Sequence, residues 1–174
     1  MFLASGCVCF VPVDEPAADA STPPGSETWV STNSTWLSAG VAPDAGWNTD
    51  PSFDDSRWTP LTSLFPRDPL LPAEADSVWN GPGFSAGTTK LWARRTFTLS
   101  QAPTGAVLKA ACNDDMEVWL NGTKLISDSD GVSTYRTLDD VRAQLVTGKN
   151  LLAATCEDKV GPEHAFYLLL TLQP

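Results

Sequence analysis

The sequence predicts an all-β fold, and three observations lead to this prediction. The chain contains fourteen prolines and twelve glycines, which favour many turns over long helices. Several short runs alternate apolar and polar residues, as strands with one buried face do. The dipeptide Asn121-Gly122 is a strong hairpin signal, because both residues tolerate the positive φ of a type I′ turn.

At 174 residues the chain is expected to hold one domain and an N-terminal tail. Residues 28–174 are the predicted domain, and residues 12–27, which lack aromatic residues, are a predicted flexible linker. Residues 1–11 are interpreted as a truncated signal or lipobox segment, because small residues precede Cys7, the residue that would be lipidated. A basic region is missing before Cys7, so an apolar N-terminus without such a role is the alternative.

The first part of the domain is expected to combine short strands with long loops. Two strands are predicted, at residues 28–30 and 35–37. Residues 46–58 space their aromatics five or six apart among turn residues, which fits neither a helix nor a strand. We expect an ordered loop there, with Phe53 and Trp58 in the core and an Asx-type turn at residues 54–56. Residues 59–90 are predicted to be irregular chain.

Regular structure is predicted to resume at residue 91. The predicted strands are 91–99, 106–112, 116–120, 123–126, 151–156 and 165–172. Alternation places Trp92 and Arg94 on the face opposite the core, and it places Trp119 on the non-core face of its own strand. The polar run Asn113-Asp114-Asp115 is predicted to be a corner between two strands. One short helix is predicted at 138–146, after a Thr N-cap and acidic residues in its first turn.

Two cysteines occupy matching places in the predicted strands. Cys112 ends one apolar run and Cys156 ends another, and each is followed by a polar residue. If the two strands are neighbours, the cysteines can form a disulfide worth roughly 3–4 kcal/mol, which export would permit. Two buried free thiols are the alternative.

The net charge of −10 bears on the partners of the protein. A chain this acidic lacks the basic surface needed to neutralise phosphates, which argues against a nucleic-acid partner. No run approaches the ~18 apolar residues of a membrane span, so membrane contact is expected only through a lipid at Cys7. We expect the protein to be exported to the cell surface or to the periplasm.

Several motifs in order resemble one family, the galactose-binding-domain-like β-sandwiches. They are Trp47 with Phe53–Trp58, the arginine-bearing run Leu91–Phe97, the corner and hairpin Asn113–Gly122, the turn Gly148–Leu152 and the final run Phe166–Leu172. The resemblance implies a jelly-roll sandwich, as in carbohydrate-binding modules and in the N-terminal sugar-binding domains of many glycoside hydrolases. It covers about residues 28–174, and it does not fix the ligand, because sites grafted on a fold determine its function.

Exposed aromatics are the expected carbohydrate contacts, because the apolar face of a sugar ring stacks on them. The candidate ligand-binding residues are Trp47, Trp79, Trp92, Arg94, Trp119 and Tyr135. Burial in the core is the alternative role of each aromatic, and a structural ion pair is the alternative role of Arg94.

Metal and catalytic chemistry have fewer candidates. Asn113 and Asp114 supply oxygen atoms that a Ca²⁺ ion would accept, although hydrogen bonds to the turning backbone explain them as well. Adjacent Asp114 and Asp115 point to opposite faces in strand geometry, so they cannot flank one glycosidic bond. The single histidine, His164, is interpreted as a loop residue, and no resident cofactor is predicted.

The sequence therefore supports three hypotheses about function. The first is a non-catalytic carbohydrate-binding or adhesion-type module of an exported, lipid-anchored protein. The second is a structural or protein-interaction domain of the same fold without a sugar site. The third is an enzyme, a glycoside hydrolase of which this domain would be an accessory fragment.

Overall fold

The computed structural model describes residues 28–33, 35–63, 76–79, 89–132, 134–159 and 164–174. The predicted linker and lipobox segment, including Cys7, lie outside these residues. Among the residues described, no helix is long and apolar enough to cross a membrane.

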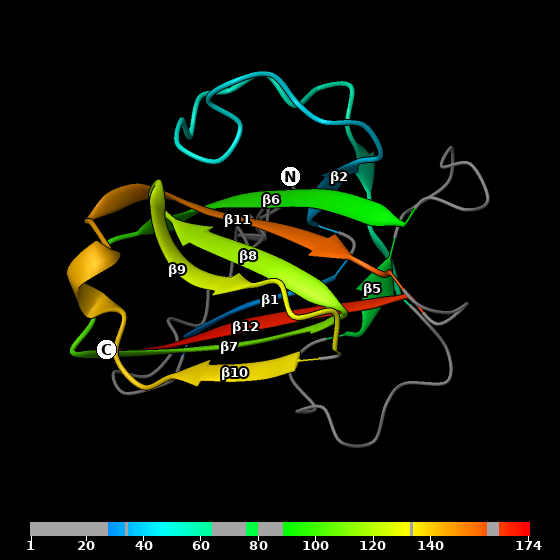
Figure 1. The fold of residues 1–174 in the computed structure, drawn as a ribbon. Helices are drawn as coiled ribbons and strands as arrows, with labels where there is room; N and C mark the ends of the chain where they lie inside the picture. Colours follow the sequence, from blue (N-terminus) through cyan, green and yellow to red (C-terminus); the bar gives the residue numbers. More distant parts are fainter. Residues whose placement is uncertain (1–27, 34, 64–75, 80–88, 133, 160–163) are drawn as a thin grey trace, which may run out of the picture.

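The described chain forms two antiparallel sheets packed face to face (Figure 1). Sheet A contains six strands: β1 (Thr28–Ser31), β4 (Thr62–Ser63), β5 (Val78–Trp79), β7 (Gly105–Asn113), β10 (Thr134–Leu138) and β12 (Ala165–Gln173). Its order is β10-β7-β12-β5-β4, with β1 also pairing with β12. This arrangement confirms the predicted all-β sandwich.

Sheet B has the order β3-β2-β6-β11-β8-β9. Its strands are β2 (Leu37–Ala39), β3 (Thr59–Pro60), β6 (Lys90–Leu99), β8 (Asp115–Leu120), β9 (Thr123–Asp128) and β11 (Gly148–Glu157). The two central strands, β6 and β11, pair along their full length from Gly148↔Leu99 to Glu157↔Lys90. The predicted strands from residue 91 onward are confirmed, and β3, β4 and β5 show that part of 59–90 is more regular than predicted.

The core lies between the sheets and follows the alternation of the strands. Sheet A contributes the even-numbered residues of β7 and β12, and sheet B contributes the inward residues of β6, β8 and β11. Trp36 is fully buried there and meets Phe166 edge to face, with ring centroids 6.1 Å apart. Met116, Val118 and Leu120 lie in this core as predicted.

The polar corner carries the chain from one sheet to the other. Asn113 ends β7 in sheet A, Asp115 begins β8 in sheet B, and the Asn113–Asp114 peptide is cis. Beside the corner, Cys112 and Cys156 form the predicted disulfide, with Cα atoms 5.7 Å apart. The bridged strands, β7 and β11, belong to different sheets, so the disulfide crosses the core instead of joining paired neighbours.

The predicted hairpin is confirmed by its backbone geometry. Asn121 has φ 49° and Gly122 has φ 81°, the positive values that a type I′ turn requires. The Asn121 side chain also donates to the Gln144 carbonyl at 2.7 Å and accepts from the Leu151 N–H at 2.8 Å. The hairpin residue therefore joins the turn before β11 to the β8–β9 pair.

The predicted helix at 138–146 is reduced to a 3-10 turn, η1 (Arg142–Gln144). Leu138 instead ends β10, where it pairs with Leu108 of β7. The Asp140 carboxylate accepts from the backbone N–H of Arg142 at 3.0 Å, and such local bonds compete with helix formation. Val141 and Leu145 are nevertheless buried, so the apolar stripe covers the end of the core without a helix.

Candidate functional site

The candidate site lies on the face of sheet B that points away from the core, here called the outer face. It consists of three rows across β8, β11 and β6. The rows are Trp119–Ala153–Arg94, Glu117–Thr155–Trp92 and Asp115–Glu157–Lys90. Each row follows from the strand register, because residues two apart on a strand share a face.

A long connection covers one end of the outer face. The segment between β2 and β3 arches over sheet B, drawn in cyan at the top of Figure 1. Its Phe53 and Trp58 contact each other with ring centroids 6.1 Å apart, and both are only half-buried. The prediction that these two rings enter the core was wrong, because the segment packs outside sheet B. The predicted Asx turn is present, since the Asp54 carboxylate accepts from the Ser56 N–H at 3.1 Å.

Arg94 anchors this connection to the sheet. Its side chain is 1% exposed and donates to the Asp55 carboxylate at 2.7 Å and to the Asp50 carbonyl at 2.9 Å. It also donates to the Phe53 carbonyl at 3.1 Å, and its guanidinium lies 5.2 Å from the Phe53 ring. Burial lowers the pKa of Arg94, opposed by the charges of Asp55 and Asp50. These contacts match the structural ion pair that the sequence left as an alternative.

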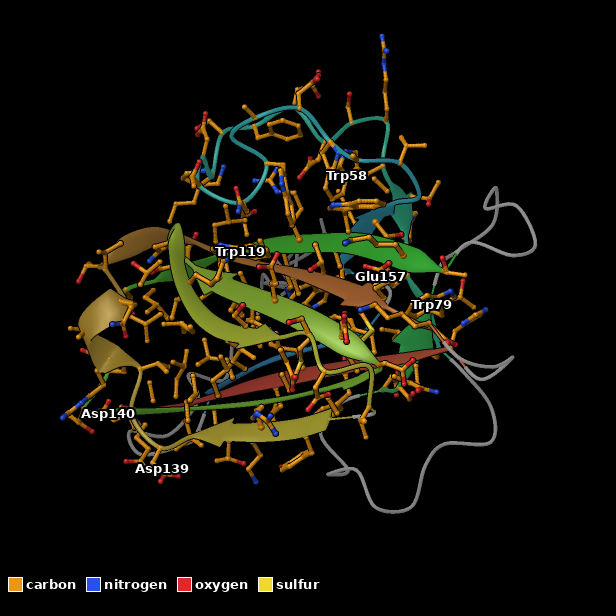
Figure 2. The ribbon with its side chains drawn as sticks, viewed as in Figure 1. Trp58, Trp79, Trp119, Asp139, Asp140 and Glu157 are labelled. Carbon is orange, nitrogen blue, oxygen red and sulfur yellow. A yellow bond between two sulfur atoms is a disulfide. The ribbon has the colours of Figure 1, made fainter. Side chains whose placement is uncertain are left out.

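The predicted aromatic contacts fall into three places. Trp92 and Trp119 lie on the outer face of sheet B. Trp119, labelled in Figure 2, is 7% exposed, and its ring centroid lies 5.4 Å from that of Trp47 in the connection. Trp79 is 3% exposed in β5, whereas Tyr135 is 48% exposed on edge strand β10 of sheet A. The structure therefore does not gather the six candidate residues into one surface.

Trp92 differs from the other tryptophans of the outer face. It is half-buried, and the Lys90 ammonium lies 5.7 Å from its ring centroid. Trp92 pairs with Thr155 of β11, and Thr155 pairs on its other side with Glu117 of β8. Trp92 thus stands between the covered row of Arg94 and the row of Lys90.

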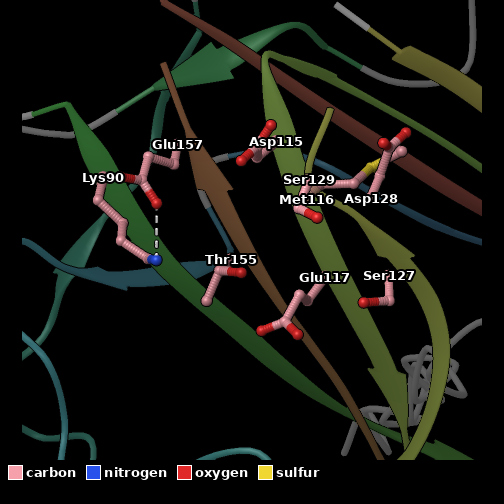
Figure 3. Close-up of a pocket in the computed structure, with 9 residues that line it drawn as sticks. All are labelled: Lys90, Asp115, Met116, Glu117, Ser127, Asp128, Ser129, Thr155 and Glu157. Atoms are coloured by element: carbon pink, nitrogen blue, oxygen red, sulfur yellow. Dashed lines mark hydrogen bonds and ion pairs between the residues drawn. The ribbon is translucent and has the colours of Figure 1, made fainter. Parts of the chain in front are cut away.

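A pocket of about 250 Å³ opens at the uncovered end of the outer face and extends to β9, where Asp128 pairs with the core residue Met116 and so belongs to the inner face (Figure 3). Four acidic residues line it, Asp115, Glu117, Asp128 and Glu157, together with Lys90, Met116 and the hydroxyl residues Ser127, Ser129 and Thr155. The volume is slightly below the ~300–1,000 Å³ of typical ligand pockets, which suits a small ligand.

Hydrogen bonds fix the carboxylate of Asp115 at the corner end of the pocket. It accepts from the Gly131 N–H at 2.8 Å and forms an ion pair with Lys159. The hydrogen bond from Lys159 is the main cause that lowers the pKa of the Asp115 carboxyl, and the Gly131 N–H adds to it. Asp115 is therefore held ionised at neutral pH.

The residues predicted as a weak calcium site lie beside this pocket. Asp114 is 4% exposed, and its carboxylate accepts from the Lys159 N–H at 2.9 Å. Within the described part of the chain, no group of three or more His, Cys, Asp or Glu residues has a geometry that could hold a metal ion.

His164 lies outside any strand, just before β12, as the interpretation as a loop residue predicts, and its side chain is partly buried. Its Nδ1 lies 2.5 Å from the Asp158 carboxylate, and its ring stacks on Trp79 with centroids 5.0 Å apart. The Asp158 side chain is 1% exposed, so this contact closes the end of the sandwich near β5.

The sequence did not single out the pocket residues as a site. Alternation alone places Glu117 beside Trp119 and Lys90 beside Trp92. The missing information was that β11 lies between β6 and β8, which brings these two sets of residues together.

The sequence matches no model of a known protein family and no curated protein. Solved structures share the fold. A glycosyl hydrolase family 2 member from Bacteroides cellulosilyticus aligns with TM-score 0.51 and 16% identity, over 83% of this chain and 20% of that chain. A β-glycosidase from Bacteroides vulgatus aligns with TM-score 0.51 and 19% identity, over 82% and 20%. A β-glucuronidase from Bacteroides uniformis gives TM-score 0.51 and 16% identity, over 86% and 18%.

This chain therefore spans about a fifth of the length of these glycoside hydrolases. At such low identity the likeness establishes the fold, that of a β domain found within larger glycoside hydrolase chains.

Proposed function

We propose that this protein is a non-catalytic carbohydrate-binding module whose site is the pocket on the outer face of sheet B. The observation that carries the proposal is the row Glu117–Thr155–Trp92, which joins the polar pocket to a half-buried tryptophan. A sugar needs this combination, because its apolar face stacks on an aromatic ring while its hydroxyls bond to polar groups. The fold shared with domains of glycoside hydrolases supports the proposal.

A catalytic role has less support. A general acid in glycoside hydrolysis needs a carboxyl with a raised pKa. The pKa of Asp115 is lowered, and Glu117 and Glu157 are each paired with a lysine. We therefore propose that the module binds sugar without cleaving it, and that it serves as an accessory unit of a glycoside hydrolase or of another surface protein.

A structural or protein-interaction domain is the second candidate, and the burial of the aromatics favours it. Trp79 and Trp119 are 3% and 7% exposed, so neither is available as a stacking surface. In this alternative the outer face would have no sugar partner, and the pocket would be only a solvated array of ion pairs.

Sugar titrations distinguish the two candidates. The protein is screened against a glycan array, and each hit is titrated by calorimetry against wild type and Trp92→Ala. Loss of one stacking contact, worth about 1 kcal/mol, should weaken binding about fivefold. Tyr135→Ala is the matched control, because Tyr135 is 48% exposed on the other sheet. An array without any hit, with and without Ca²⁺, would reject the carbohydrate module in favour of the second candidate.

We also propose that the protein is exported and carries a lipid at Cys7. The inter-sheet disulfide supports export, because disulfides persist mainly in oxidising compartments. Mass spectrometry of the mature N-terminus tests the anchor. A diacylated Cys7 at the N-terminus is the expected result, and an unmodified Met1 would reject it.

A further inference from the structure

We infer that the pocket selects neutral sugars and rejects sugars that carry a carboxylate, such as hexuronic acids. The inference rests on the proposed carbohydrate function and specifies its ligand class. It has two bases. Each acidic side chain of the pocket is already paired with a cation, and most of these cations lie outside the pocket lining.

Each acidic side chain of the pocket already has a cationic partner. Lys90 bonds to Glu157 at 2.8 Å, and this pair is drawn as a dashed line in Figure 3. Lys124 pairs with Glu117, and the Lys124 ammonium also lies 5.3 Å from the Trp119 ring. These lysines are therefore engaged by protein carboxylates before any ligand arrives.

The other two acids are paired in the same manner. Asp115 is bound by Lys159, and Asp128 is bound by Arg136 of sheet A at 2.9 Å. Lys159, Arg136 and Lys124 do not line the pocket, whereas all four acids do. A ligand consequently meets carboxylate oxygens and hydroxyls, with Lys90 as the one cation among the described residues of the lining.

This surface suits a neutral polyhydroxyl ligand. Carboxylates accept strong hydrogen bonds from sugar hydroxyls, and Thr155 can both donate and accept. A ligand carboxylate instead forms its strongest hydrogen bonds with an arginine or lysine that is not already engaged. A hexuronic acid would bring its charge next to the outer-face carboxylates Asp115, Glu117 and Glu157, and it would have to displace Glu157 from Lys90. The overall charge of −10 opposes an anionic ligand further.

Matched pairs of methyl hexosides and methyl hexuronosides, identical except at C6, test the inference. For each pair of which a member binds, calorimetry at low ionic strength should show that the neutral hexoside binds at least tenfold more tightly than the hexuronoside. The preference should shrink as salt is added, because screening weakens charge repulsion in an open pocket.

Glu157→Gln provides the decisive variant. It removes one negative charge and releases Lys90, so the preference for the neutral sugar should fall several-fold. Glu117→Gln, which releases Lys124, is a second variant that should act in the same direction. Both residues are partly exposed, with side-chain exposures of 33% and 37%, so the variants are expected to fold.

Asp140→Asn is the matched control. Asp140 is also ion-paired, to Arg142 at 2.7 Å, and it lies at the opposite end of the domain from Glu157 (Figure 2). This substitution makes the same change in net charge but should leave the preference unchanged.

The outcomes separate the inference from the function on which it rests. Equal affinity for the members of a pair, or an equal effect of Asp140→Asn and Glu157→Gln, would overturn the inference and leave a sugar-binding module. Absence of binding to every sugar would overturn both.

Discussion

Removing the Cys112–Cys156 disulfide should cost the domain much of its stability. The bridge joins β7 and β11 across the core and closes a loop with a sequence separation of 44. For a loop of this length, the chain-entropy relation gives about 4 kcal/mol at 25 °C. Small domains have net stabilities of about 5–15 kcal/mol, so the loss would be a large fraction of the total.

Urea unfolding followed by tryptophan fluorescence measures the loss. With a urea m-value of about 2 kcal/mol/M, the midpoint should fall by about 2 M when both cysteines are replaced by alanine. The substitution also removes two sulfur atoms from the core, so wild type under reducing conditions isolates the cross-link itself. Oxidised and reduced wild type with the same midpoint would refute the reasoning that the bridge constrains the unfolded chain.

Three further predictions concern stability. Arg94→Met leaves the partly exposed Asp55 without its ion-pair partner and releases the connection over sheet B, so urea unfolding should show a loss of about 3 kcal/mol. The control, Arg57→Gln at an exposed position, should change the free energy of unfolding by less than about 0.5 kcal/mol. Gly131→Ala, at φ +75° with open space around the new Cβ, should cost ~1–2 kcal/mol of stability. Gly122→Ala, at φ +81°, should cost more, because a Thr49 methyl lies 3.2 Å from the new Cβ. Equal shifts in melting temperature would show that the Thr49 contact has no effect. Asp115 has a pKa lowered from 3.8, so its stabilising contribution is present above that pH and is lost as pH falls through the lowered value; Asp115→Asn should flatten the acid limb of a stability–pH curve.

Local chemistry made part of the fold predictable from sequence. The hairpin at Asn121-Gly122 is determined by residues that tolerate positive φ, and the corner at Asn113-Asp114 was indicated by consecutive residues that favour turns. The pairing of Cys112 with Cys156 was predicted from their matching positions at strand ends, although the two strands face each other across the core instead of pairing in one sheet. Alternation also identified which side of each strand faces the core, as the burial of Met116, Val118 and Leu120 shows.

Features that depend on tertiary contacts were harder to predict. The segment at 138–146 carries helix-capping residues, but Leu138 gains more from pairing with β7 than a short isolated helix provides. Phe53 and Trp58 are aromatic, and sequence cannot distinguish packing inside a sandwich from packing on its outside. Their location was decided by Arg94, whose three hydrogen-bond partners all belong to the connection over sheet B.

The strand β6 explains why the candidate function depends on one residue. Successive outward side chains of β6 are Lys90, Trp92 and Arg94. Lys90 lines the open pocket, whereas Arg94, four positions later, forms a buried ion pair. The connection that Arg94 holds covers Trp119 with Trp47, and it thereby removes the aromatic surface that the sequence suggested. Trp92 lies at the boundary and, among the described residues, is the outward tryptophan next to the polar pocket. The contacts of Arg94 therefore fix the border between the covered and the open part of the outer face, and Trp92 lies at that border.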